Sequence, residues 1–291
     1  GIRLMRSRAL RRRLARYVHG STAPVEVRAL PGRGRGVIAT AGAAAGATVH
    51  TATPMSQVLK HQPADGPPLC RECFRPLPSG ADLCCSACEA SFEARGGSLL
   101  ARVDLSAMLA LTEGRNFPLH IALLLAGLLA EVRACGGLPQ VWAPLDLCFA
   151  ELEPESDPQT DAEHAALASA FVAAGVTNQQ TLELLLPLSR YRRLLGAAQL
   201  NAFELRLSHG AVVSALLPGI ASCFNHSCEP NVLISCGEST HVAFVAGGEV
   251  CAGAELLINY VDYDSSREDR RHLLRHKYGF DCNCVRCASG L

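Results

Sequence analysis

The stretch that decides the fold is Asn225-His226-Ser227-Cys228-Glu229-Pro230-Asn231. An isolated Asn-His pair carries little information, because a lone histidine is most often structural. Here the pair sits in a longer string of polar residues, and two further strings follow it. Residues 253–260 read Gly-Ala-Glu-Leu-Leu-Ile-Asn-Tyr, and residues 278–287 read Tyr-Gly-Phe-Asp-Cys-Asn-Cys-Val-Arg-Cys. We expect the three strings to meet in one site.

Cysteine is abundant in this chain, with 14 residues, and most of them fall into two tight groups. The first group is Cys70, Cys73, Cys84, Cys85 and Cys88, and the second is Cys228, Cys282, Cys284 and Cys287. Cys-x-x-Cys and Cys-x-Cys spacings suit thiolates that converge on one metal better than separate disulfides. No secretory signal is visible, which favours a reducing compartment. We interpret the other cysteines, including Cys223 and Cys236, as small buried hydrophobic residues.

The second group predicts a structural zinc site. Cys282, Cys284 and Cys287 supply three thiolates, which is one too few for a tetrahedral site, and Cys228 offers the fourth. Such a site would fix the C-terminal tail against the Asn225 segment, so that metal binding and closure of the site become one event. The alternatives are a local zinc knuckle or free thiols.

The first group predicts a single zinc as well. Cys70, Cys73 and Cys88 are three of the expected ligands, and the fourth is either Cys84 or Cys85, of which we take Cys85. The alternative for this group is a redox-labile loop without metal.

Composition excludes several classes of protein. The 291 residues contain 27 Lys and Arg and 27 Asp and Glu, a formal net charge of zero. A general nucleic-acid binder needs a standing basic surface, so we expect no direct nucleic-acid partner. The longest apolar run, 119–129, is too short to span a bilayer and predicts a buried helix, with no membrane association.

The N-terminal lead, 1–24, is rich in arginine and has no acidic residue before Glu26. This composition is found in organellar transit peptides. A solvated basic helix and a fragment boundary are the alternatives. Apart from that import signal, we expect a cytoplasmic or nuclear location.

The hydrophobic pattern predicts an α+β fold. Short strands are expected at 25–27, 36–38, 211–217, 232–235, 241–246 and 255–260. Helices are expected at 117–132, 164–174, 181–200 and 267–277, with an exposed acidic loop at 151–161. Strands at both ends and helices between them indicate one β-rich domain interrupted by insertions.

The three strings together resemble the SET-domain protein lysine methyltransferases, most closely their SET-and-MYND (SMYD) branch. Gly34-Arg35-Gly36 is similar to the family's first cofactor loop, and Asn201-Ala202-Phe203 to the Asn-x-Phe that precedes its core strands. The resemblance implies a β-rich SET fold with a zinc-finger-like insertion, a helical insertion and a cysteine-rich post-SET tail.

The resemblance also implies a division of the chain. The basic lead would be followed by the N-terminal part of the SET domain (25–66), a truncated MYND-like insertion (67–97), the helical insertion (98–200), the SET catalytic core (201–265) and the post-SET tail (266–291). The family's finger holds two zinc ions, but its His-x-x-x-Cys end is missing after Phe92. This departure puts a partner-binding role of the finger in doubt.

The resemblance implies transfer of a methyl group from S-adenosyl-L-methionine to a lysine of a protein, histone or non-histone, with Zn²⁺ as a structural ion. The implied cofactor residues are Arg33, Gly34, Arg35, Asn201, Asn225, His226, Tyr260 and Phe280. Tyr260 and Tyr278 are the implied catalytic residues, whereas Tyr191 is interpreted as helix packing. We expect a monomer. The alternative function is a non-catalytic SET and zinc-finger module that recruits protein partners.

Overall fold

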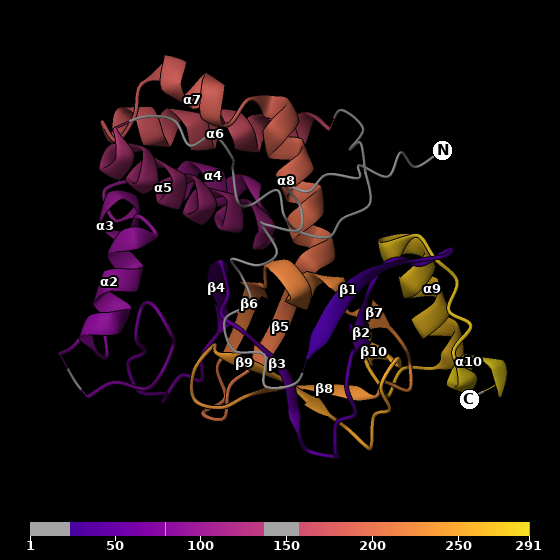
Figure 1. The fold of residues 1–291 in the computed structure, drawn as a ribbon. Coiled ribbons are helices and arrows are strands. Elements are labelled where there is room, and N and C mark those ends of the chain that lie inside the picture. The colour runs from indigo at the N-terminus through magenta and orange to yellow at the C-terminus, as the bar shows by residue number, and fades with distance from the viewer. Residues whose placement is uncertain (1–23, 79, 137–156, 291) are drawn as a thin grey trace. The chain divides into compact units, whose positions relative to one another are not determined.

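The structure is a computed structural model that describes residues 24–78, 80–136 and 157–290 (Figure 1). The basic lead therefore lies, but for Pro24, outside the described residues, and so does the first part of the predicted acidic loop. The described chain forms two compact units. Of the described residues, the first unit comprises 24–53, 218–235 and 241–290, and the second comprises 54–78, 80–136, 157–217 and 236–240.

The first unit contains two sheets. A four-stranded sheet has the order β1 (Val25–Leu30), β2 (Gly34–Ala39), β10 (Glu255–Ile258) and β7 (Asn225–His226). A three-stranded sheet has the order β3 (Thr48–Ala52), β9 (Val242–Ala246) and β8 (Val232–Cys236). The 3₁₀ helix η3 (Gly219–Cys223) precedes β7, and α9 (Arg267–Tyr278) and α10 (Val285–Ala288) form the tail.

Two pairings in the four-stranded sheet place the sequence motifs. β2 runs antiparallel to β10, with Ile38 opposite Glu255; Arg33 lies in the turn just before β2, and Gly34 is its first residue. β10 runs parallel to β7, with Leu257 opposite Asn225 and Ile258 opposite His226. The Gly-rich turn, the Asn-His pair and the strand before Tyr260 are thus neighbours in one sheet.

The second unit joins a small sheet to the helices. Its sheet has the order β4 (Ser56–His61), β6 (Val212–Leu216) and β5 (Ala202–Arg206). The helices are α2 (Ser86–Ala94), α3 (Gly97–Leu100), α4 (Ser106–Leu111), α5 (Phe117–Cys135), α6 (Pro158–Ala173), α7 (Gln179–Leu185) and α8 (Leu188–Asn201). A cluster of buried residues that includes Ile121, Leu125 and Phe171 fills the space between them. The α+β class agrees with the prediction from the sequence.

The apolar run 119–129 lies within α5, as a buried helix. Among the described residues, α5 is the one helix long and apolar enough to cross a membrane by length and composition. Half of its most apolar window is buried inside the structure. Its buried residues belong to the helical core, which accounts for their apolar character.

Several predicted elements differ from the structure. The single helix expected at 181–200 is two helices, α7 and α8, because Pro187 lacks the N–H needed to continue the first. The acidic stretch becomes helical at Pro158, where the side chain of Asp157 accepts a hydrogen bond from the Gln159 amide. Cys223 is buried as predicted, but Cys236 is only partly buried, and Cys135 and Cys251 are exposed.

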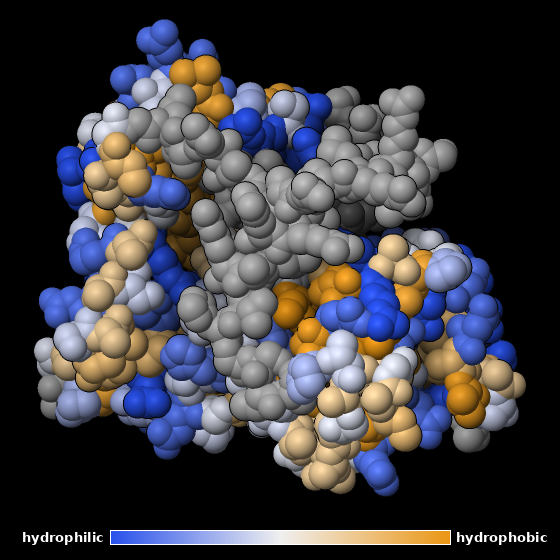
Figure 2. Space-filling view, in the orientation of Figure 1, coloured by the Kyte–Doolittle hydropathy of each residue, from blue (hydrophilic) through white to orange (hydrophobic). Residues whose placement is uncertain are grey.

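The visible surface mixes hydrophilic and hydrophobic side chains (Figure 2). Among the most exposed apolar residues are Val285 at 75% and Leu184 at 60%. Scattered exposed apolar residues are normal on soluble proteins and carry no functional meaning by themselves.

Candidate functional site

The second cysteine group is brought together within the first unit. Sγ of Cys228 lies 3.6 Å from Sγ of Cys287 and 4.0 Å from Sγ of Cys282. The four sulfur atoms, with that of Cys284, all lie within 4.8 Å of one another. Four thiolates bound to zinc at 2.3 Å stand about 3.8 Å apart, so the arrangement fits one tetrahedral ion. The position of Cys228 beside the three tail cysteines agrees with its predicted role as the distant fourth ligand.

 Cys282 and Cys284 precede α10, Cys287 lies within α10, and Cys228 follows β7 by two residues.

Burial explains why these thiols need a cation. Cys228 is fully buried, and burial raises the pKa of its thiol to about 12. A bound divalent cation reverses this effect, because it favours the thiolate that coordinates it. The donor set therefore fits zinc, which prefers sulfur ligands in closed structural sites.

The first cysteine group forms a second four-thiol cluster, within the second unit. Its members are Cys70, Cys73, Cys84 and Cys88. Sγ of Cys84 lies 3.6 Å from Sγ of Cys73 and 3.4 Å from Sγ of Cys88. Cys85 was the expected fourth ligand, and the structure corrects this to Cys84. Cys85 is exposed at the N-cap of α2, and although its Sγ lies 3.7 Å from Sγ of Cys84, it is not one of the four sulfur atoms that lie within 4.8 Å of one another.

The predicted cofactor loop lies against the Asn225 segment. Gly34 has φ +68°, a conformation that side chains rarely adopt, and nothing lies within 4 Å of the position a Cβ would take. A Cβ on Gly36 would meet Nδ2 of Asn225 at 3.0 Å. The Asn225 amide in turn donates to the carbonyl of Arg35 at 3.0 Å. The two glycines thus allow one close backbone approach and leave one open face.

Glu255 ties this loop together, although the sequence analysis assigned it no role. Its Oε1 accepts from Nδ2 of Asn225 at 2.9 Å and lies 3.6 Å from a guanidinium nitrogen of Arg33. The Arg33 guanidinium also donates to the carbonyl of His226 at 3.3 Å. Glu255 is the only charged residue in the string 253–260, and that isolation is the signal that could have found it.

Asn231, the last residue of the motif 225–231, is hydrogen-bonded to the backbone of β10. Asn231 donates to the carbonyl of Glu255 at 2.9 Å and accepts from the amide of Leu257 at 2.8 Å. The amide of Ser227 donates to the carbonyl of Ile258 at 2.9 Å. These bonds hold the chain on both sides of Cys228 against the strand that leads to Tyr260.

His226 lies between the tail cluster and Tyr260. Its Nδ1 accepts a hydrogen bond from the Tyr260 amide at 3.1 Å, and its Nε2 lies 3.3 Å from Sγ of Cys228. Because Nδ1 is an acceptor, the ring proton resides on Nε2 and points to the sulfur. Burial, together with the nearby cations Arg33 and Arg270, lowers the pKa of His226 to about 4, so the ring is neutral at pH 7.

Two aromatic rings lie beside this histidine, and a third lies beside one of them. The centroid of the Tyr260 ring lies 5.3 Å from that of His226 and 4.9 Å from that of Tyr278. The Phe280 ring lies 6.0 Å from His226. The Tyr260 hydroxyl donates to the carbonyl of Phe224 at 2.5 Å. Tyr260 lies two residues beyond the end of β10 rather than within the strand, and Phe224 is a partner that the sequence did not reveal.

The structure therefore brings most predicted site residues together in the first unit. They are Arg33, Gly34, Arg35, Asn225, His226, Tyr260, Tyr278 and Phe280. Asn201 lies in the second unit, where it is buried and its Nδ2 donates to the carbonyl of Ala197 at 2.8 Å. Tyr191 is fully buried among the helices and donates to Glu163 at 3.3 Å, as expected for packing.

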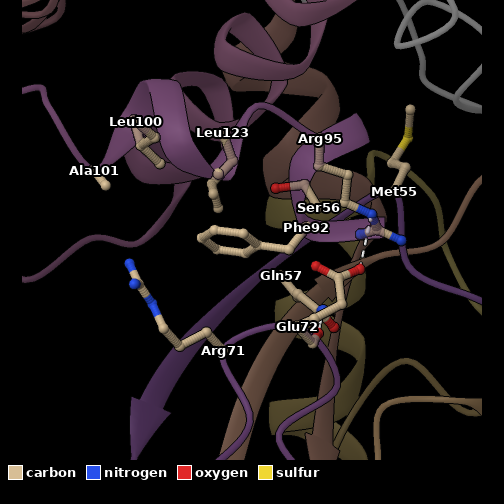
Figure 3. A pocket seen from close by; sticks show the side chains of 11 residues that line it. Met55, Ser56, Gln57, Arg71, Glu72, Phe92, Arg95, Leu100, Ala101 and Leu123 are labelled. Carbon is tan, nitrogen blue, oxygen red and sulfur yellow. Dashed lines mark hydrogen bonds and ion pairs between the residues drawn. The ribbon is translucent and has the colours of Figure 1, made fainter. Parts of the chain in front are cut away.

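A separate cavity of about 230 Å³ lies within the second unit (Figure 3). Phe92 points into it, and Glu72 and Arg95 form an ion pair at its wall, with 3.1 Å between Oε1 and Nε. Glu72 also accepts from Ser91 at 2.6 Å, while Arg71 lies 4.9 Å from the Phe92 ring centre. None of the predicted cofactor or catalytic residues lines this cavity.

Comparison with known proteins identifies the family. The SET domain family matches residues 34–261, which is most of the chain. The chain therefore belongs to the SET domain family. This match spans the first cysteine group, includes Cys228 and ends just beyond Tyr260, before the three tail cysteines.

Individual relatives are similar over different extents. Histone-lysine N-methyltransferase SMYD3 of Mus musculus is 44% identical over 23% of this chain and 15% of its own length. Histone-lysine N-methyltransferase ATXR4 of Arabidopsis thaliana is 26% identical over 91% of this chain and 86% of its own length. The chain spans less than a third of the length of several curated relatives with which it shares short, more similar stretches.

A solved structure of the SET domain of LSMT bound to MeLysine and AdoHcy has a TM-score of 0.44 and 14% identity. It covers 95% of this chain and 57% of its own.

Proposed function

We propose that this chain transfers a methyl group from S-adenosylmethionine to the side-chain amine of a lysine in a protein substrate. The observation that carries the proposal is the cluster around His226. In one unit it joins an open glycine loop, a hydrogen-bonded Tyr260 hydroxyl and a four-thiol metal site. The names of the SMYD3 and ATXR4 relatives support this reaction class.

The residues present fit the cofactor. A methionine-like carboxylate and amine need donors and acceptors close to the backbone, and the open face of Gly34 beside Asn225 offers that approach. Phe280, near His226, provides an apolar ring for a purine face. When bound, S-adenosylmethionine supplies a sulfonium methyl group that is displaced in line by a neutral amine.

Tyr260 is the residue best placed to act on the transfer. Its hydroxyl proton is engaged by the Phe224 carbonyl, so the oxygen keeps its lone pairs for a polarised C–H group. Such contacts are weak but directional, and they act by fixing the alignment of the reacting atoms. The oxygen atom of Tyr260 is held from the protein side before any ligand arrives.

Tyr260 and Tyr278 would also form walls around the target lysine. An apolar aromatic lining disfavours the ammonium form and lowers the pKa of the amine, which must lose its proton before transfer. Nζ of Lys277 lies over the Tyr278 ring, 5.0 Å from its centre.

The test uses the zinc-loaded chain, S-adenosylmethionine with a labelled methyl group, and a mixture of histone and non-histone proteins. The proposal predicts label in protein, found by mass spectrometry as a methyl group on lysine. Label bound to the chain without transfer to any protein would favour the non-catalytic binding module instead. Label transferred only to residues other than lysine would contradict the proposed acceptor.

A further inference from the structure

Arg270 is a cation buried beside the tail cysteine cluster. It lies on α9 and is only 1% exposed, although the other arginines of that helix reach solvent. An isolated buried charge is costly, so a buried arginine requires partners that satisfy its donors. One of its guanidinium nitrogens, Nη1, donates to the carbonyl of Ser265 at 2.7 Å.

Cysteine thiols are among the further partners of Arg270. Its guanidinium interacts favourably with Cys228 and with Cys287, two of the four members of the cluster. Leu274, one turn further along α9, packs in the same buried cluster as Cys228, Cys282 and Cys287. One face of α9 is therefore directed at the sulfur atoms.

The positive charge of Arg270 would offset the negative charge of a zinc-bound cysteine cluster. Four thiolates around one divalent zinc ion carry a net charge of −2, and the two thiols that Arg270 contacts are almost fully buried. A guanidinium halves that charge and donates N–H groups to sulfur. Such partners outside the ligand set hold the ligands in place and tune their basicity.

We propose that Arg270 is a positioning residue for the tail metal, and that its buried guanidinium keeps zinc in the site formed by Cys228, Cys282, Cys284 and Cys287. It acts through Cys228 and Cys287 and does not bind the metal itself. The proposal concerns metal retention, so it is independent of whether the chain transfers methyl groups.

The test measures zinc release from the purified, zinc-loaded full chain to a chromogenic chelator. The described residues hold two four-thiol clusters, so zinc release is expected in two phases. The phase that belongs to the tail site is the one that is missing in Cys228→Ser. Arg270→Met keeps the length of the side chain and removes its charge, whereas Arg270→Lys keeps the charge and loses the planar fork. Arg267→Met, on the exposed part of the same helix, is the matched control.

Arg270→Met is expected to speed the tail phase about 10- to 100-fold, the usual effect of losing a partner of a metal ligand. Arg270→Lys is expected to restore part of the loss, and Arg267→Met to release zinc as the unmodified chain does. Release from Arg270→Met at the unmodified rate would overturn the proposal. So would equal rates in the Met and Lys variants, because packing alone would then account for the effect.

If Arg270→Met does not fold, the Lys variant decides. Faster zinc release from Arg270→Lys than from the unmodified chain would support the role of the planar guanidinium in contacting both Cys228 and Cys287. An unchanged release rate would overturn the proposal.

Discussion

The imidazole of His226 bridges Tyr260 to Cys228, accepting from the Tyr260 amide at 3.1 Å and lying 3.3 Å from the Cys228 sulfur. One neutral ring thereby links the tail metal site to the residue proposed to act on the methyl group. Movement of Cys228 on metal loss would be passed directly to the backbone of Tyr260. The metal site and the aromatic cluster are thus parts of one structural unit.

Replacing His226 by phenylalanine should break this link while keeping a ring in the same space. The buried Tyr260 amide loses its acceptor, which costs about 1–3 kcal/mol in the free energy of unfolding. Denaturant unfolding of the zinc-loaded protein measures the loss. His241→Phe, at an exposed histidine of the same unit, should cost far less, and an equal loss in both would contradict the bridging role.

Replacing Tyr260 by phenylalanine should lower methyl transfer by at least about 100-fold, the scale seen when one aligned polar group is lost. Cofactor binding should change little, because the ring remains. The measurement compares labelled methyl transfer with cofactor affinity for the same protein sample. Tyr263→Phe, at a tyrosine that is 56% exposed, is the control. If Tyr260→Phe transferred methyl groups as fast as Tyr263→Phe does, the role assigned to Tyr260 would be refuted.

The first cysteine cluster should lose its metal when Cys84 is replaced by serine and keep it when Cys85 is replaced. Cys84 lies within reach of Cys73 and Cys88, whereas Cys85 is exposed at the N-cap of α2. Zinc content per chain, measured by atomic emission, checks this difference. The reverse result would restore Cys85 as the ligand.

The buried His120 should make the protein less stable as the pH falls. Both ring nitrogens bond to hydroxyls, those of Ser56 at 2.8 Å and Ser214 at 2.9 Å. Burial lowers its pKa to about 3, against 6.5 for an unperturbed histidine. Between these values the unfolded chain binds a proton that the folded chain does not, so stability falls from about pH 6.5 towards pH 3.

The comparison that isolates this effect uses His120→Gln. At pH 7 the variant should be the less stable protein, because it loses buried hydrogen bonds. Its disadvantage should shrink as the pH falls, since it has no imidazole to protonate in the unfolded state. His50, whose pKa burial lowers to about 4, is present in both proteins and cancels. A stability difference that stays constant from pH 7 to pH 5 would contradict the prediction.

The sequence was most informative where chemistry constrains spacing. Three tail cysteines require a fourth ligand, so the distant Cys228 could be named before its position was known. The strands on either side of the Gly34 turn follow from alternating apolar residues and the glycines between them. In these places local pattern and final structure obey the same constraint.

The choice between Cys84 and Cys85 could not be made in that way. The two sulfur atoms are adjacent, 3.7 Å apart, and only that of Cys84 lies within 4.8 Å of all three other members of the cluster. Spacing alone carries no information about that difference. The break between α7 and α8 is different, because Pro187 was present in the sequence and predicts the interruption.

Glu255 and Arg270 escaped sequence analysis because their roles depend on neighbours that are remote in the chain. Arg270 belongs to a charged stretch that reads as a solvated helix, and only the folded tail shows that its side chain faces sulfur. Asn201 is the opposite case. It matched the family motif, yet it lies in the second unit, and its contact with the cofactor stays a prediction.

The most direct test of the account compares Cys228→Ser with Cys251→Ser, an exposed cysteine of the same unit, for zinc content and methyl transfer in the same samples. Cys228→Ser should lose one of two zinc ions and nearly all methyl transfer, while Cys251→Ser should keep both. A Cys228→Ser protein that retains its full zinc content and transfers methyl groups at the unmodified rate would contradict the account.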